Sequence, residues 1–262
     1  MPTATNEQPL HRYVQHVMGM PVSLALRGTH AATDAGRAAW AAAMAELAAV
    51  DRVFSTYRVD SAISRLDRGE LRLDECPPEV AEVLALGAAA SAASGGAFST
   101  HLPDPGATDG RRRLDPSGVV KGWAAERAAR HLALLDGTDF CLSVGGDITC
   151  RAAAGSPRWR IGIEDPYDPS RVLAVVPVRT GAVATSGTTH RGAHLVDART
   201  GLPPSGVASV TVIGSSLTWA DLDATAAYAL GEGAATWLVT RPIDSALVVA
   251  PDSRITTIVP PR

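Results

Sequence analysis

Short turns between neighbouring apolar, alternating segments constrain this fold more than any other feature of the chain. Residues 12–28 form two such segments broken near Met18 and Gly19, 140–152 form two around Gly145–Gly146, and 245–259 form two around a polar turn. Strands joined by a tight turn pair antiparallel, whereas parallel strands need a long crossover. The pattern predicts an α+β fold of largely antiparallel sheets packed with helices, rather than a Rossmann fold.

Helical periodicity marks four longer segments and one short one between these strands. Residues 33–54 form the clearest helix, with Thr33 or Asp34 as its cap and one apolar stripe of Trp40, Met44, Leu47, Val50 and Phe54. The other predicted helices are 77–96, about 123–135, 219–231 and a short one in 234–242. We expect 55–70 to be loop with a short helical turn and 99–118 to be loop. A flexible tail, 1–10, precedes a single compact domain, 11–262.

Composition excludes several classes of protein. The net charge of −3 gives no electrostatic case for nucleic acid or an anionic membrane. No apolar run is long enough to span a bilayer, and no signal peptide is visible. The three cysteines, Cys76, Cys141 and Cys150, lack metal-binding spacing and suit a reducing compartment. The expected location is therefore the cytoplasm.

Familiar catalytic and nucleotide-binding motifs are missing from the sequence. There is no GxGxxG after a strand, no P-loop and no GxSxG elbow. His190 and His194 have the spacing of a zinc pair on a helix, but their Gly/Thr-rich surroundings make a loop the better interpretation. Lys121 is the only lysine in an arginine-rich chain. Lys121 is either an ordinary surface ammonium or a phosphate contact at a site where arginine cannot replace lysine.

The segment 219–231 raises a specific question about its polar residues. Asp221 and Thr225 share one helical face, while Asp223 points elsewhere. Acids in a first helical turn favour the helix dipole, which is one explanation. The other is a pair of oxygen ligands for a hard cation such as Mg²⁺. Glycine loops elsewhere would let backbone amides approach phosphates, so the second explanation implies a nucleotide as well.

Eight blocks in order resemble the ApbE family of Mg²⁺-dependent FAD:protein FMN transferases. They are FSTYRVDSAISRL, GGAF, LDPSGVVKGWAAERAARHL, VGGDI, WRIGIEDP, VATSGTTHR, HLVDARTG and ADLDATAAYALG, and they run from Met18 to about Gly231. The resemblance implies transfer of FMN from FAD to a Ser or Thr hydroxyl of a target flavoprotein, with release of AMP. Hydrolysis of FAD to FMN and AMP, and flavin binding without catalysis, remain the alternatives.

The same resemblance implies roles for individual residues. The implied metal ligands are the Gly118 carbonyl, Asp221 and Thr225, and the implied catalytic residues are Asp221, as a ligand, and His194, as a candidate base. The implied FAD contacts are Met18, Tyr57, Ala97, Phe98, Ser99, Asp115, Lys121 and Leu195. Two features depart from the family pattern: Ser99 stands where Asp is usual, and the segment 99–114 is shorter than usual.

Overall fold

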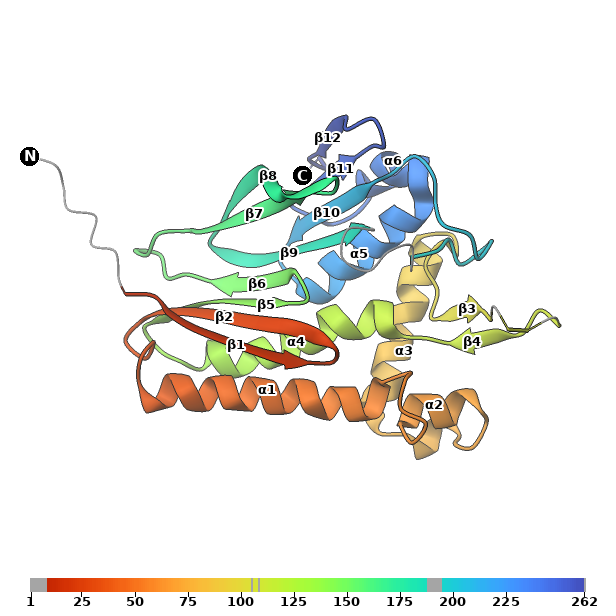
Figure 1. Ribbon diagram of the computed structural model, residues 1–262, viewed down its shortest axis with the longest axis horizontal. Coiled ribbons are helices and arrows are strands. Elements are labelled where there is room, and N and C mark those ends of the chain that lie inside the picture. Colours follow the sequence, from red (N-terminus) through yellow and green to blue (C-terminus); the bar gives the residue numbers. More distant parts are fainter. Residues whose placement is uncertain (1–8, 105, 108, 188–194, 262) are drawn as a thin grey trace, which may run out of the picture.

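Eight strands form one antiparallel sheet within the described residues, which are 9–104, 106–107, 109–187 and 195–261 of the computed structural model (Figure 1). The strand order is β1-β2-β5-β6-β9-β10-β11-β12, and each neighbouring pair runs antiparallel. The strands are β1 (His11–Val17), β2 (Met20–Gly28), β5 (Thr138–Val144), β6 (Asp147–Arg151), β9 (Thr180–Gly187), β10 (Ser209–Gly214), β11 (Ser245–Val249) and β12 (Ile255–Ile258).

The two faces of this sheet are covered differently. Helices pack on one face and share the main core with it, including Leu24, Leu142 and Leu222. A separate hairpin, β7 (Trp159–Asp165) and β8 (Asp168–Val178), covers part of the other face through a second core that contains Trp159, among others. The helices are α1 (Asp34–Phe54), α2 (Ala62–Asp67), α3 (Pro78–Ala93), α4 (Ser117–Ala133), α5 (Leu217–Leu230) and α6 (Ala234–Leu238), with short turns η1 (Leu73–Glu75) and η2 (Gly231–Gly233).

This architecture confirms the predicted α+β class and most of its elements. Thr33 caps α1 by accepting a hydrogen bond from the Gly36 amide, and the predicted apolar stripe of that helix is buried. None of the helices in the described part of the chain is both long and apolar enough to cross a bilayer.

Two glycine-containing turns lie side by side at one end of the sheet. Gly145 and Gly146 join β5 to β6 with φ of 58° and 97°, and Met18 and Gly19 join β1 to β2 with φ of 55° and 68°. Two successive residues with positive φ match the twist of a two-residue hairpin. The Gly145 amide donates to the Pro21 carbonyl at 3.0 Å, which joins the two hairpins next to their turns.

Two sequence predictions between α3 and β5 are wrong. The segment 99–118, expected to be loop, contains a small sheet of β3 (His101–Pro103) and β4 (Arg112–Leu114). The following helix, expected from about Trp123, begins at Ser117. Its start is supported from outside the helix, because the Asp115 carboxylate accepts bonds from the Ser117 amide at 3.1 Å and the Ser117 hydroxyl at 2.5 Å. Lys121 is therefore a residue of α4 and not of a preceding turn.

The start of α5 also differs from the sequence prediction. The helix begins at Leu217, and the Ser216 hydroxyl caps it by accepting from the Trp219 amide. No acidic residue lies in the first turn of this helix. Asp221 and Asp223 thus lie one turn further in, where the field of the helix terminus is weaker. The dipole explanation for Asp221 loses its structural basis.

Gly122 sets the close approach of α4 to α5, and we predict that Gly122→Ala destabilises the fold. A Cβ at this position would lie 2.8 Å from both Asp221 Cβ and the Leu217 carbonyl oxygen. Overpacking of this kind lowers the free energy of unfolding by about 1–3 kcal/mol. Urea denaturation measures the change, with Gly155→Ala as the control because nothing lies within 4 Å of a Cβ there. Equal stability of the two variants would contradict the prediction.

Candidate functional site

A cavity of about 920 Å³ opens where the two glycine turns, the first turns of α4 and the middle of α5 meet. Its wall contains every site residue predicted from the sequence that lies within the described part of the chain: Met18, Tyr57, Ala97, Phe98, Ser99, Asp115, Gly118, Lys121, Leu195, Asp221 and Thr225. His194 and His190 lie outside the described residues. The structure thus brings together residues that the sequence spreads over more than 200 positions.

Lys121 forms the electrostatic centre of this wall. Its Nζ lies 2.5 Å from Asp147 Oδ2 and 3.2 Å from Asp221 Oδ1. Both carboxylates have side chains only 1% exposed, and that of Lys121 is 19% exposed. The alternative of a surface ammonium is therefore wrong. When both carboxylates are charged, they and the one ammonium leave one net negative charge in a nearly buried cluster, an arrangement that favours a further cation.

Backbone amides hold both carboxylates in place. The Gly122 amide donates to Asp221 Oδ2 at 2.9 Å, across the α4–α5 contact. The Thr185 amide donates to Asp147 Oδ1 at 3.1 Å. Each carboxylate thus has one oxygen fixed by the backbone and the other directed at Lys121.

The pKa values in this cluster reflect burial and charge in competition. Burial raises the pKa of Asp221 to about 7, with the Lys121 ammonium opposing the rise and the Asp147 carboxylate adding to it. Burial lowers the pKa of Lys121, but the two carboxylates outweigh it, so this pKa lies above its usual value. The lysine is therefore held as an ammonium, whereas the charge of Asp221 depends on its neighbours.

Thr225 lies one turn along α5 from Asp221, on the same face. Its hydroxyl is 3.1 Å from the Ser186 hydroxyl at the end of β9. Gly118 is its neighbour in α4, because a Cβ at Gly118 would lie 3.9 Å from Thr225 Cγ2 and only 3.0 Å from the Phe98 ring. The two helices and Phe98 thus bring a carboxylate, a hydroxyl and a glycine backbone close together.

Two residues of the cavity wall are unusual, Tyr57 in its exposure and Met18 in its backbone conformation. Tyr57 is 98% exposed, so its ring is open to solvent and does not pack into the core. Met18 has φ of 55°, a left-handed conformation that is uncommon for a residue other than glycine. Both side chains belong to the cavity wall. An exposed aromatic ring and a strained residue at one cavity are features of binding sites.

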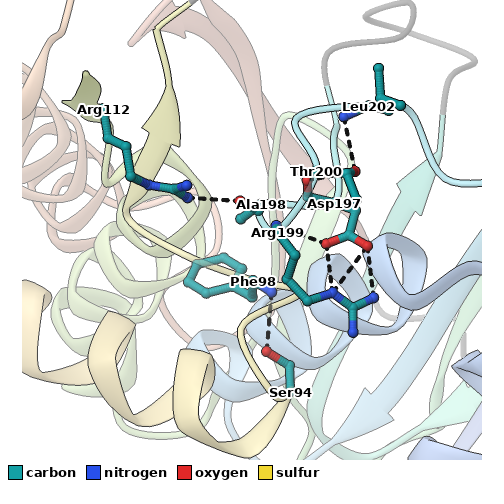
Figure 2. A network of polar contacts seen from close by, with 8 residues as sticks. All are labelled: Ser94, Phe98, Arg112, Asp197, Ala198, Arg199, Thr200 and Leu202. Atoms are coloured by element: carbon teal, nitrogen blue, oxygen red, sulfur yellow. Dashed lines mark hydrogen bonds and ion pairs between the residues drawn. The ribbon is translucent and has the colours of Figure 1, made fainter. Parts of the chain in front are cut away.

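The loops on one side of the cavity are tied to each other by polar contacts (Figure 2). The Ala198 amide donates to the Ala97 carbonyl at 2.9 Å, and the Phe98 amide donates to the Ser94 hydroxyl at 3.1 Å. Arg112 of β4 donates to the Ala198 carbonyl at 2.7 Å. The short segment 99–114 therefore supports the loop that follows Leu195.

The site contains residues that the sequence did not single out. Asp147 follows the Gly145–Gly146 turn, and Ser186 lies in the VATSG block. The available signal for each was a polar residue at the end of an apolar strand, inside a block already recognised. Arg113 also lines the cavity, where it pairs with Asp115 at 3.2 Å.

Comparison with known proteins gives one family and several relatives. Residues 18–105 and 100–248 match the model of the ApbE family. The FAD:protein FMN transferase of Rhodobacter capsulatus is 33% identical over 129 residues, covering 46% of this chain and 24% of that protein. The FAD:protein FMN transferase of Escherichia coli K12 is 31% identical over 153 residues, covering 50% of this chain and 44% of that protein. The matches thus span less than half the length of these two relatives.

Solved structures match over nearly the whole chain. The ApbE protein of Thermotoga maritima has a TM-score of 0.79 at 20% identity, covering 95% of this chain and 96% of that chain. The flavin transferase ApbE of Vibrio cholerae has a TM-score of 0.79 at 21% identity, covering 96% and 98%. The flavinyl transferase ApbE of Pseudomonas stutzeri has a TM-score of 0.77 at 24% identity, covering 97% and 96%. These likenesses establish the fold.

Proposed function

The chain belongs to the ApbE family, and from this we propose that it transfers FMN from FAD to a Ser or Thr hydroxyl of a target flavoprotein, with release of AMP. The proposal assigns this activity to a domain of residues 11–262. The observation that carries it is the grouping of Lys121, Asp221 and Thr225 on the wall of one large cavity with Tyr57 exposed beside them. Incubation with FAD, Mg²⁺ and an acceptor, followed by identification of both products, tests it.

The residues fit a magnesium ion on the grounds of donor chemistry and charge. The Asp221 carboxylate, the Thr225 hydroxyl and the Gly118 carbonyl are the hard oxygen ligands that Mg²⁺ prefers. With Asp221 ionised, the buried cluster of Lys121, Asp147 and Asp221 has one residual negative charge that a cation would balance. Within the described residues, no three His, Cys, Asp or Glu side chains form a metal-binding group, so this proposal rests on one carboxylate and neutral oxygens.

A bound Mg²⁺ would supply charge neutralisation at the pyrophosphate and at the AMP that leaves. The chain's own residues bind and orient the substrate. The Lys121 ammonium interacts with phosphate oxygens as a compact positive charge. The remaining proposed FAD contacts are Met18, Tyr57, Ala97, Phe98, Ser99, Asp115 and Leu195.

The reaction itself exchanges one phosphorus–oxygen bond for another. The acceptor hydroxyl oxygen bonds to the FMN phosphorus, and the bond from that phosphorus to the bridging oxygen breaks, so that AMP leaves with this oxygen. The hydroxyl proton passes to a base, for which we propose His194. Asp221 is a poor base in this scheme because its carboxylate is a metal ligand. Water in place of the hydroxyl would give FMN and AMP, which is the hydrolytic alternative.

Tyr57 provides a prediction about FAD binding. Its ring is exposed at the cavity, and stacking on a flat ring contributes about 0.5–1.5 kcal/mol beyond the buried area. We expect Tyr57→Phe to keep the FAD affinity nearly unchanged and Tyr57→Ala to weaken it. Titration of flavin fluorescence measures both dissociation constants. Equal losses in the two variants would mean that the hydroxyl, and not the ring, makes the contact.

A further inference from the structure

The two carboxylates that contact Lys121 face different surroundings. Asp221 is part of the cavity wall, whereas Asp147 is 1% exposed and is not among the described residues that form this wall. Both carboxylates are 1% exposed, so they differ in their place relative to the cavity wall and not in burial. The carboxylate of Asp147 is nearly closed to solvent, and its ion-pair partner in the described residues is Lys121.

The Lys121 ammonium lies closer to the Asp147 carboxylate than to the Asp221 carboxylate. Its Nζ is 2.5 Å from Asp147 Oδ2 but 3.2 Å from Asp221 Oδ1. The backbone fixes Asp147 independently, because it directly follows the Gly145–Gly146 turn and its Oδ1 accepts from the Thr185 amide. The fixed, buried carboxylate of Asp147 thus attracts the Lys121 ammonium away from Asp221 of α5.

The two carboxylate oxygens of Asp221 have different partners. Its Oδ2 accepts from the Gly122 amide, and its Oδ1 lies 3.2 Å from Lys121 Nζ, so a divalent cation that binds this carboxylate lies within a few ångströms of the ammonium. Two positive charges at one carboxylate repel each other, and this repulsion is strong in a site with little water. The position of the ammonium therefore determines how well Asp221 holds a cation.

We propose that Asp147 is a positioning residue that holds the Lys121 ammonium back from Asp221, so that Asp221 remains able to bind a divalent cation. This inference rests on the cation site of the proposed function. Without the Asp147 charge, the ammonium pairs with Asp221 alone and competes with the cation directly. Asp147 thus controls cation affinity although it contacts no cation.

Mn²⁺ binding to the full chain without FAD, monitored by electron paramagnetic resonance at pH 8, tests this inference, since burial raises the pKa of Asp221 to about 7 and protons compete less with the cation above that pH. Asp147→Asn keeps the acceptor for the Thr185 amide and removes the charge. We expect it to weaken Mn²⁺ binding by about 10-fold or more, given a unit charge lost within a few ångströms. The double variant Asp147→Asn/Lys121→Met removes the competing ammonium as well. Its Mn²⁺ affinity should return to within about 3-fold of the parent value, because the net charge of the cluster is the same.

The double variant separates positioning from other roles of Asp147. If Asp147 were itself a cation ligand or only a support of the fold, adding Lys121→Met would not restore binding, and continued weak binding would overturn the inference. Unchanged Mn²⁺ affinity in folded Asp147→Asn would overturn it too. Should Asp147→Asn fail to fold, folded Lys121→Met alone provides the test at pH 8 and above, where proton competition at Asp221 is weaker and the inference requires tighter Mn²⁺ binding than in the parent. Equal or weaker binding would contradict that.

Asp221→Asn distinguishes failure of this inference from failure of the cation site itself. If the parent chain binds no Mn²⁺, or binds it equally well after Asp221→Asn, the cation site fails and the inference fails with it. If Asp221→Asn abolishes binding while the double variant shows no recovery, only the role of Asp147 is wrong. Circular dichroism of each variant verifies that it is folded.

Discussion

Replacing Asp221 by asparagine is expected to lower the rate of FMN transfer by about 10²–10³-fold, since a bound cation contributes several kcal/mol to stabilising transferred phosphate charge. Asparagine keeps the shape of the side chain and can still accept the Gly122 amide bond, but it loses the negative charge. Mg²⁺ affinity and transfer should therefore fall together. Transfer rates measured against Mg²⁺ concentration show both effects. A folded variant with a normal rate and unchanged Mg²⁺ dependence would exclude this residue as a ligand.

Asp223→Asn is the matched control on the same helix. Asp223 is 3% exposed, but its carboxylate accepts from Arg241 Nε at 2.9 Å and does not belong to the cavity wall formed by the described residues. We expect the variant to lose stability while its transfer keeps a normal Mg²⁺ dependence. Thr225→Ala should lie between these results, with partial rescue by excess Mg²⁺, because it removes a neutral ligand.

Lys121→Met is expected to lower the free energy of unfolding by about 3–5 kcal/mol at pH 8, as breaking a buried ion pair leaves uncompensated charge. Asp147 and Asp221 would then lie in the interior without their ammonium. Burial already raises the pKa of Asp221 to about 7, and losing the opposing charge of Lys121 raises it further. The folded variant then binds protons that the unfolded chain, with a carboxyl pKa of about 4, does not. Its stability deficit should therefore shrink as the pH falls from 8 to 5.

Urea denaturation of the parent and the variant at both pH values measures this deficit. The control is Arg72→Met, because the Arg72 side chain is 73% exposed and pairs with Asp74 at the surface. An exposed pair contributes about 0–1 kcal/mol, so we expect a small effect without strong pH dependence. A Lys121→Met deficit that stays constant or grows towards pH 5 would contradict the assignment of a buried carboxylate cluster.

The hairpins and long helices could be predicted from sequence because local chemistry determines them. Paired glycines at 145–146 specify a two-residue turn, and Thr33 with its apolar stripe specifies α1. The start of α4 could not be predicted in the same way. The sequence DPSG is typical of a turn. In the structure, the Asp115 carboxylate accepts hydrogen bonds from the amide and hydroxyl of Ser117, and the helix begins there.

The small β3–β4 sheet was missed because each strand has three residues, too few for any alternation to show. Its place is fixed by tertiary contacts, such as the bonds that Arg112 donates to the His101 and Ala198 carbonyls. The Ser99 hydroxyl also accepts from the His101 amide at 3.0 Å, so this departure from the family pattern has a local structural role.

For the site, the order of motifs gave the candidate residues but not their partners. Asp221 and Lys121 were separate predictions in sequence, and only the α4–α5 contact at Gly122 shows that they form an ion pair. Asp147 had no signal of its own beyond its place after a glycine turn. Pairing between residues about 100 positions apart depends on how the helices pack, which periodicity does not encode.

The most direct test of the proposed function is a product analysis with FAD, Mg²⁺ and a flavoprotein domain that bears an exposed Ser or Thr. We expect intact-mass spectrometry to find the acceptor heavier by one FMN less one water, with one AMP released for each acceptor modified. The Asp221→Asn variant should form both products about 10²–10³-fold more slowly. An unmodified acceptor with free FMN and AMP would show a hydrolase, and FAD bound but not consumed would show a flavin-binding protein. Either result, obtained with an acceptor that another flavin transferase modifies, would contradict the assignment of this chain as an FMN transferase.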